Sequence, residues 1–213
     1  RRAGGCWQEK TSESHKEYAM SADAFGLLST APTMQAFLTA LDLAECDADI
    51  ERFMTVHAVL FTDLSGFSAH PIVVQGLQRI RRIEYALSGA LSASGGIVIK
   101  SLGDSHLMMF PDVADAVGCV ELVWATCPDN PFCVGIGYGQ MVVCEYYHGR
   151  LDVFGVEVSA ASRLGEDVAS DSQMLLTPAA YAQLSQALQR RCVAGLEGGI
   201  RYWEFLGERT EAA

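Results

Sequence analysis

The chain has 213 residues, a formal net charge of −11, 50% hydrophobic residues and 19% charged residues. This composition is typical of a globular protein that is long enough to bury a sizeable core. The acidic charge argues against a protein that binds a nucleic-acid polymer, because such a protein needs a basic face. No run of 18 apolar residues is present, so the sequence predicts no segment that crosses a membrane.

The cysteines do not follow a disulfide or zinc pattern. There are seven, an odd number, and no two are spaced as C-x-x-C. Most have apolar neighbours, so we expect reduced thiols in the core of a cytoplasmic protein. A zinc site is not expected, because paired ligand spacing is missing.

The first quarter of the chain differs in pattern from the rest. Residues 1–20 are polar and predict a loosely ordered tail. Residues 21–54 predict two helical pieces broken near Pro32, and the second carries apolar residues at helical spacing: Met34, Phe37, Leu38 and Leu41. A helix packed on the main domain explains this stripe, and a dimer or regulatory helix is the alternative. We therefore separate an N-terminal tail and helical segment, residues 1–54, from a main domain, residues 55–213.

The main domain alternates between strand and helix patterns. In chain order, the predicted elements are a strand at 56–62, a helix from Pro71, short strands at 97–99 and 107–110, a helix from Pro111 and a strand at 132–138. This β-α-β-β-α-β order is the ferredoxin-like arrangement. We therefore predict an α/β protein of the α+β type, with a ferredoxin-like core followed by extra C-terminal strands and helices.

Two aspartates should meet at the end of the predicted sheet. Asp63 follows the first strand, and Asp104 lies in the turn between the second and third. In a ferredoxin-like topology the third strand lies antiparallel beside the first, so these two residues become neighbours. Two converging carboxylates repel each other unless they are protonated or bridged by cations. Hard oxygen ligands suit Mg²⁺ or Mn²⁺, so the pattern favours a metal site over two unrelated loop aspartates.

The turn after Asp63 is compact and contains a glycine. It offers backbone N–H groups close to the predicted metal site, and Gly66 allows a phosphate to approach closely. We therefore predict that it holds phosphate groups; its residues are Ser65, Gly66, Phe67 and Ser68.

Four segments carry these features in chain order: LFTDLSGFS, IVIKSLGDSHLMMF, VGIGYGQMVV and LDVFGVEVSAASRL. Together they resemble the catalytic domain of class III nucleotide cyclases, over about residues 56–205. These enzymes work as dimers with active sites at the interface, and they convert a nucleoside triphosphate to a 3′,5′-cyclic nucleotide and pyrophosphate. The resemblance implies a homodimer, a nucleoside triphosphate substrate and two Mg²⁺ or Mn²⁺ ions, with no membrane or nucleic-acid partner.

The resemblance also implies roles for single residues. Asp63 and Asp104 would bind the two ions, with the backbone at Leu64 close to the metal. One ion would activate the ribose 3′-hydroxyl for attack on the α-phosphate, and the other would hold the triphosphate.

The base and the α-phosphate would be contacted from the partner subunit. Lys100 aligns with a lysine that donates to the adenine ring, and Asp152 with the position that accepts from the adenine amino group. ATP, giving cyclic AMP, is therefore the favoured substrate. Arg163 aligns with the arginine that stabilises charge on the α-phosphate. Without the resemblance, Lys100 is a strand-end lysine, Asp152 a turn residue and Arg163 a helix-surface arginine.

The sequence departs from the family pattern at two places. Ser159 stands where the family usually has an asparagine that orients the ribose, and serine is shorter with a single donor. Glu197 stands where the family often has a lysine that holds the outer phosphates, although Arg201 could serve instead. Three interpretations remain: an adenylate cyclase that uses serine, a pyrimidine cyclase of the bacterial anti-phage type that makes cyclic UMP or cyclic CMP, and a degenerate module that binds nucleotide or dimerises.

Overall fold

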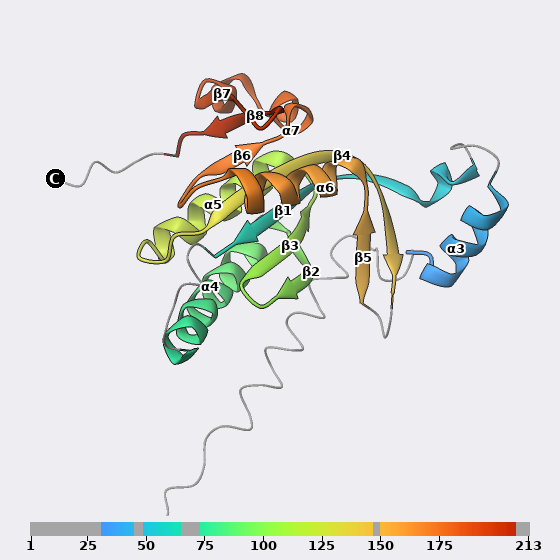
Figure 1. The fold of residues 1–213 in the computed structure, drawn as a ribbon, viewed down its shortest axis with the longest axis horizontal. Coiled ribbons are helices and arrows are strands. Elements are labelled where there is room, and N and C mark those ends of the chain that lie inside the picture. The colour runs from blue at the N-terminus through green and yellow to red at the C-terminus, as the bar shows by residue number, and fades with distance from the viewer. Residues whose placement is uncertain (1–30, 45–48, 65–72, 147–149, 208–213) are drawn as a thin grey trace, which may run out of the picture.

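The protein is built around one mixed β-sheet, seen in a computed structural model that describes residues 31–44, 49–64, 73–146 and 150–207 (Figure 1). The strands are β1 (Met54–Asp63), β2 (Ile97–Leu102), β3 (Ser105–Phe110), β4 (Cys133–Glu145), β5 (Leu151–Phe154), β6 (Met174–Leu176), β7 (Cys192–Glu197) and β8 (Ile200–Phe205). Their order in the sheet is β2-β3-β1-β4-β6-β8-β7, with β5 paired to β4 off this path.

Apart from the first helix and the 3₁₀ turn, which precede β1, the helices lie between these strands. The helices are α3 (Met34–Leu43), α4 (Val73–Ser94), α5 (Val113–Thr126), α6 (Val156–Arg163), α7 (Pro178–Gln183) and α8 (Gln186–Gln189), with a 3₁₀ turn η3 (Glu51–Phe53) and a π-helical turn η5 (Leu164–Val168). The order β1-α4-β2-β3-α5-β4 confirms the predicted ferredoxin-like core. The elements from β5 to β8 are the predicted C-terminal additions.

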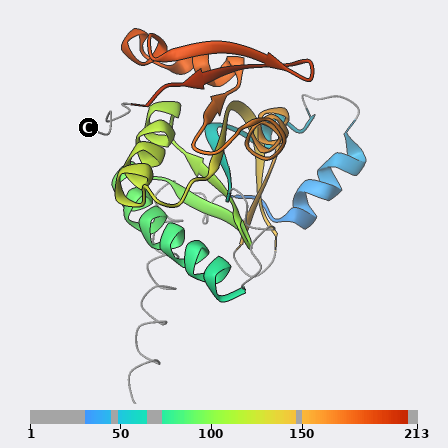
Figure 2. The same cartoon turned by 60° about the vertical axis from the view of Figure 1, so that its left-hand side comes forward.

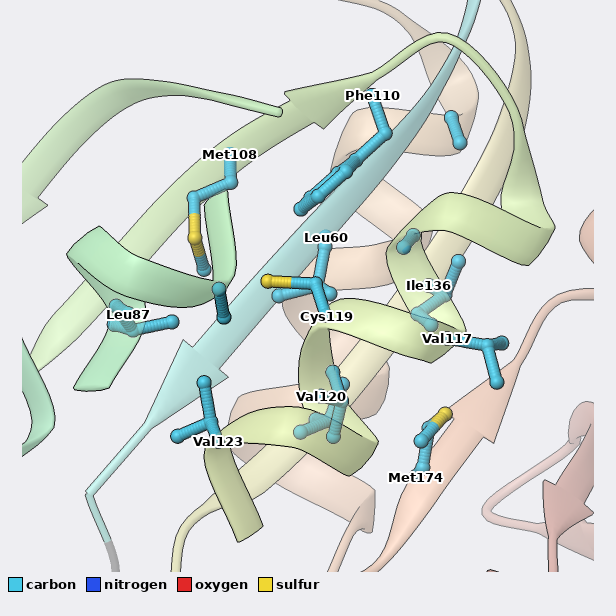
Figure 3. Packing of buried hydrophobic residues seen from close by; sticks show 14 of the residues in the cluster. Leu60, Leu87, Met108, Phe110, Val117, Cys119, Val120, Val123, Ile136 and Met174 are labelled. Atoms are coloured by element: carbon cyan, nitrogen blue, oxygen red, sulfur yellow. The ribbon is translucent and has the colours of Figure 1, made fainter. Parts of the chain in front are cut away.

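Helices cover both faces of the sheet (Figure 2): α4 and α5 lie on one face and α6 on the other. The alternation of side chains along β1 explains this, because Leu60 belongs to the core under α4 and α5, and Val59 to the core that includes α6. Figure 3 shows Leu60 and Phe110 from the sheet facing Val120 of α5. Full burial of such a side chain contributes about 1.5–3 kcal/mol.

The caps of α5 and α7 match sequence signals. Asp112 accepts a hydrogen bond from the backbone N–H of Asp115 at 2.8 Å and caps α5, so this helix starts two residues after Pro111. Thr177 caps α7 in the same manner through Ala180, with a proline in the first turn. The helix predicted from Pro71 is α4, whose described part begins at Val73.

The N-terminal segment touches the far end of β4. The backbone N–H of Glu145 donates to the carbonyl of Pro32 at 2.9 Å, and Thr33 forms a bridge with Glu145. Of the two helical pieces expected over residues 21–54, the second is present as α3, where Phe37 packs edge-on against Phe53, and the first lies outside the described residues. No residue of α3 is fully buried. Its apolar stripe is therefore only partly covered, whereas a helix packed on the main domain would bury it.

Three of the described cysteines lie in the core, as expected. They are Cys119, Cys133 and Cys144. Burial raises the pKa of the Cys119 thiol to about 11, so this group stays protonated and unreactive near neutral pH.

In the ranges that the structure describes, none of the helices combines the length and apolar character that crossing a bilayer requires.

Candidate functional site

Asp63 and Asp104 lie at the same end of two neighbouring strands. Asp63 is the last residue of β1, and it pairs in register with Ser105, the first residue of β3, and with Cys133, the first residue of β4. Asp104 directly precedes Ser105 in the β2–β3 turn, where Gly103 has a φ of +69°. The topology therefore brings the two carboxylates together as the strand order predicts.

The electrostatics of this strand end favour a bound cation. Burial raises the pKa of Asp63, and repulsion from Asp104 and then Glu166 raises it further. Hydrogen bonds from the Leu64 backbone and from Ser105 act in the opposite direction. A positive ion between the carboxylates would relieve this repulsion.

The donors at this strand end fit magnesium or manganese. Among the described residues, no group of three or more His, Cys, Asp or Glu side chains could hold a metal ion. Asp63 and Asp104 therefore form a sparse set, which the backbone carbonyl of buried Leu64, water and substrate phosphates would have to complete. Mg²⁺ is usually bound this way, through one or two carboxylates and substrate oxygens.

Glu166 was missed by the sequence reasoning. It lies in η5, directly after α6, and reaches Asp63 only because η5 packs against β1 and β4. The predicted phosphate-binding turn, Ser65, Gly66, Phe67 and Ser68, lies outside the described residues.

Lys100 and Asp152 form an ion pair within one chain. Lys100 Nζ of β2 lies 2.6 Å from Asp152 Oδ1 of β5. The same Oδ1 accepts a hydrogen bond from the Val153 backbone N–H at 2.8 Å. The lysine side chain is 39% exposed and the aspartate side chain 10%, so the pair can be reached from its lysine side. Asp152 lies in a strand, which corrects the simpler interpretation of it as a turn residue.

Ser159 and Arg163 lie on the surface of α6. They are four residues apart, which places them on the same side of the helix. Both are exposed, and Arg163 is the last residue before the π-helical turn η5. Such π-helical turns frequently occur at functional sites. The helix therefore presents both predicted groups at the surface of the chain.

Glycines bring α6 directly onto the backbone of β4. A Cβ atom at Gly135 would overlap the carbonyl oxygen of Ala161, and one at Gly137 would overlap the carbonyl oxygen of Glu157. The signal for this contact was present in the sequence as VGIGYG, because alternate glycines leave one face of a strand bare.

Glu197 and Arg201 lie at the tip of the β7–β8 hairpin. Glu197 pairs with Ile200 and Leu196 pairs with Arg201, around a Gly198-Gly199 turn with positive φ angles. Both charged side chains are exposed. The hairpin forms the edge of the sheet opposite β2 and is separated from β1 by β4 and β6. The structure therefore does not bring either residue next to Asp63 in the sheet.

A cavity of about 500 Å³ lies elsewhere, between the middle of α4 and the turn after α5. None of the predicted site residues lines it; its lining residues are Arg81, Arg82, Tyr85, Ala86, Thr126, Cys127, Pro128, Asp129 and Asn130. The aspartates at the strand ends remain the better candidate, because they unite converging carboxylates with the predicted ligand chemistry.

The sequence matches no protein-family model and no curated protein. Solved structures do resemble the fold. The guanylyl cyclase Cya2 is 15% identical with a TM-score of 0.63, covering 74% of this chain and 96% of that one. An adenylate cyclase from Trypanosoma brucei is 17% identical with a TM-score of 0.60, covering 74% and 92%. The guanylate cyclase domain of RhGC from Catenaria anguillulae, in complex with GTP, is 14% identical with a TM-score of 0.58, covering 71% and 96%. At these identities the likeness shows the fold alone.

Proposed function

We propose that this chain, which has the fold of nucleotide cyclase catalytic domains, converts a nucleoside triphosphate to a 3′,5′-cyclic nucleotide and pyrophosphate. The observation that carries the proposal is the convergence of Asp63 and Asp104 at the ends of β1 and β3 within that fold. Sparse carboxylates at such a position suit a substrate that brings its own phosphate oxygens to the metal.

Asp63 and Asp104 would hold two Mg²⁺ or Mn²⁺ ions, with the Leu64 carbonyl as a further ligand. Bound there, the ions would neutralise phosphate charge and lower the pKa of the attacking ribose hydroxyl. The turn Ser65, Gly66, Phe67 and Ser68 would hold the phosphates through backbone N–H groups.

At the other end of the nucleotide, Lys100 and Asp152 would read the base. A lysine donor and a carboxylate acceptor match the edge of adenine, which favours ATP. Because the two side chains bind each other at 2.6 Å, a base must break their contact and replace both halves of it. Arg163 would stabilise charge on the α-phosphate, and Ser159 would contact the ribose.

We propose a cytoplasmic homodimer as the active form, with residues 55–213 as its catalytic domain. In it, Lys100, Asp152 and Arg163 of one subunit would complete a site around Asp63 and Asp104 of the partner subunit. The exposure of Arg163 on α6 supports this, because the side chain is available to a second copy. A site divided in this way is complete only when two subunits associate, so activity should depend on protein concentration.

A pyrimidine cyclase is the second candidate. Ser159 supports it, since this exposed serine replaces an asparagine of the family pattern and changes the sugar end of the site. A UTP or CTP substrate would then give cyclic UMP or cyclic CMP, for use in anti-phage signalling. A module that binds nucleotide without turnover is the third candidate.

The test is incubation of the purified full chain with ATP, GTP, UTP or CTP and Mn²⁺, with products identified by mass spectrometry. We expect cyclic AMP and pyrophosphate in equal amounts, and none with EDTA. Cyclic UMP or cyclic CMP alone would show that the adenine assignment is wrong. If no triphosphate is consumed, the cyclase proposal fails, and bound ATP in that case would support the third candidate.

A further inference from the structure

On the side of β4 that faces away from β1, the pairing strand changes near the middle of β4. On the side away from β1, residues 134–136 pair with β6, and residues 142–145 pair with β5. Tyr138 lies in the interval, where neither strand reaches. A backbone N–H at such a position still needs an acceptor.

Glu157 supplies that acceptor from the first turn of α6. Its Oε2 accepts a hydrogen bond from the Tyr138 backbone N–H at 3.2 Å. The carboxylate lies over the bare face of the strand, since a Cβ built at Gly139 would come 3.0 Å from Glu157 Cγ. The side chain therefore replaces a missing strand partner.

The same oxygen also reaches α7. Thr177 Oγ1 donates to Glu157 Oε2 at 2.6 Å and accepts from the Ala180 N–H at 3.2 Å, so the hydroxyl both caps α7 and binds α6. The Thr177 backbone N–H donates to the Ile136 carbonyl of β4 at 2.9 Å. Thr177 is 3% exposed and Glu157 is half-buried, so the threonine end of this junction is shielded from water and its bonds are costly to lose. One carboxylate thus ties together β4, α6 and α7.

We propose that Glu157 is a positioning residue for the cyclase reaction. It fixes the position and rotation of α6 on β4, so that the side chains of Ser159 and Arg163 can contact the substrate. This inference rests on the proposed function. Glu157 lies two residues before Ser159 and six before Arg163 on a helix of 8 residues, so a shift of its first turn moves both. A displacement of about 1 Å at a reacting group can cost about 10²-fold in rate.

A simpler role for Glu157 makes different predictions. An acidic residue in the first turn of a helix is stabilising through the helix dipole alone. That role needs the charge but not the two hydrogen bonds. Glutamine keeps an acceptor oxygen of the same reach and loses the charge, whereas aspartate keeps the charge and loses the reach. The two substitutions therefore separate positioning from the dipole effect.

The experiment measures kcat and KM for the triphosphate that wild type uses, together with the unfolding midpoint of each variant. Glu157→Ala should lower kcat about 10–100-fold with KM little changed, because substrate binding elsewhere is intact. Glu157→Asp should lower kcat in the same direction. Glu157→Gln should stay within about threefold of wild type, because it can still accept from Tyr138 and Thr177. Glu84→Ala, at an exposed glutamate of α4, is the matched control and should leave kcat unchanged.

A double-mutant cycle with Arg163→Ala tests whether Glu157 acts through that arginine. In the Arg163→Ala background, Glu157→Ala should cost much less than it does alone. Full additivity, or an active Glu157→Asp beside an impaired Glu157→Gln, overturns the positioning role even though the cyclase assignment stands. A wild type that makes no cyclic nucleotide overturns the proposed function and this inference with it. A Glu157→Ala variant that unfolds at the assay temperature leaves the decision to the aspartate and glutamine variants, whose predicted order is opposite for the two roles.

Discussion

The two ends of the candidate site differ in their electrostatics: one holds like charges, and the other holds an ion pair. At the end of β1, Asp63 faces Asp104, and burial together with like-charge repulsion raises the pKa of Asp63. Between β2 and β5, Lys100 and Asp152 neutralise each other at 2.6 Å. The first end gains by binding a cation, whereas the second must give up an existing contact before it can bind. The aspartate end therefore favours a bound cation, and the proposed base end opposes any ligand that cannot replace both Lys100 and Asp152.

The largest expected effect comes from removing one of the converging carboxylates. Asp63→Asn and Asp104→Asn should each lower kcat by at least about 10²–10³-fold, the usual cost of losing one group that stabilises developing charge. Circular dichroism should show an unchanged fold, because neither side chain is a core residue. Asp171→Asn, in an exposed turn, is the control and should keep full activity. Turnover that survives in either site variant would contradict the assignment of a metal site to this strand end.

An intermediate effect is expected when the base-end pair is broken. Lys100→Ala should lower kcat/KM for ATP about 10–100-fold, since a hydrogen bond to a charged group contributes about 1.5–3 kcal/mol. Its effect on stability should be at most about 1 kcal/mol, because the lysine is partly exposed. Steady-state kinetics with each triphosphate measures this, with Arg190→Ala as the control. An equal loss for all four triphosphates would mean that Lys100 does not read the base.

The smallest expected effect is on the thermal stability of the metal-free protein and on how that stability depends on pH. The folded-state pKa of Asp63 lies above its unfolded value, so the folded protein binds this proton more tightly. The contribution of Asp63 to the stability of the wild type therefore rises as pH falls through the folded pKa. In EDTA, Asp63→Asn should unfold at a slightly higher temperature than wild type at pH 7, and this gain should shrink toward pH 4. Differential scanning calorimetry checks it, and a gain that grows on acidification would refute the repulsion.

The sequence was most informative where local pattern and topology act together. Apolar periodicity placed the strands and helices of the core, and the strand order alone brought Asp63 beside Asp104. It was less informative about β4, which was predicted to end at residue 138 but continues to Glu145. The extension exists because residues 139–142 pair with the start of β1 and residues 142–145 pair with β5, partners that no local pattern reveals.

Contacts that depend on helix placement could not be predicted. Glu157 and Glu166 look like ordinary surface acids in the sequence, and only the docking of α6 and η5 on the sheet gives them partners. Asp152 resembled a turn residue, because its strand β5 has only 4 residues and is stabilised by β4. The sequence thus identified residues with candidate chemistry, while tertiary packing decided which of them meet.

The glycine face of β4 sets a limit on how this protein can vary. Where α6 crosses Gly135 and Gly137, backbone atoms meet backbone atoms. Such a contact has no rotamers, so no side-chain rearrangement can absorb an added methyl group. The closest approach of α6 to β4 is therefore set by backbone atoms at these two glycines, whereas the rotation of α6 on the sheet still depends on side chains such as Glu157. Changes to the proposed substrate site must come from side chains around this contact, because the backbone contact cannot be adjusted in small steps.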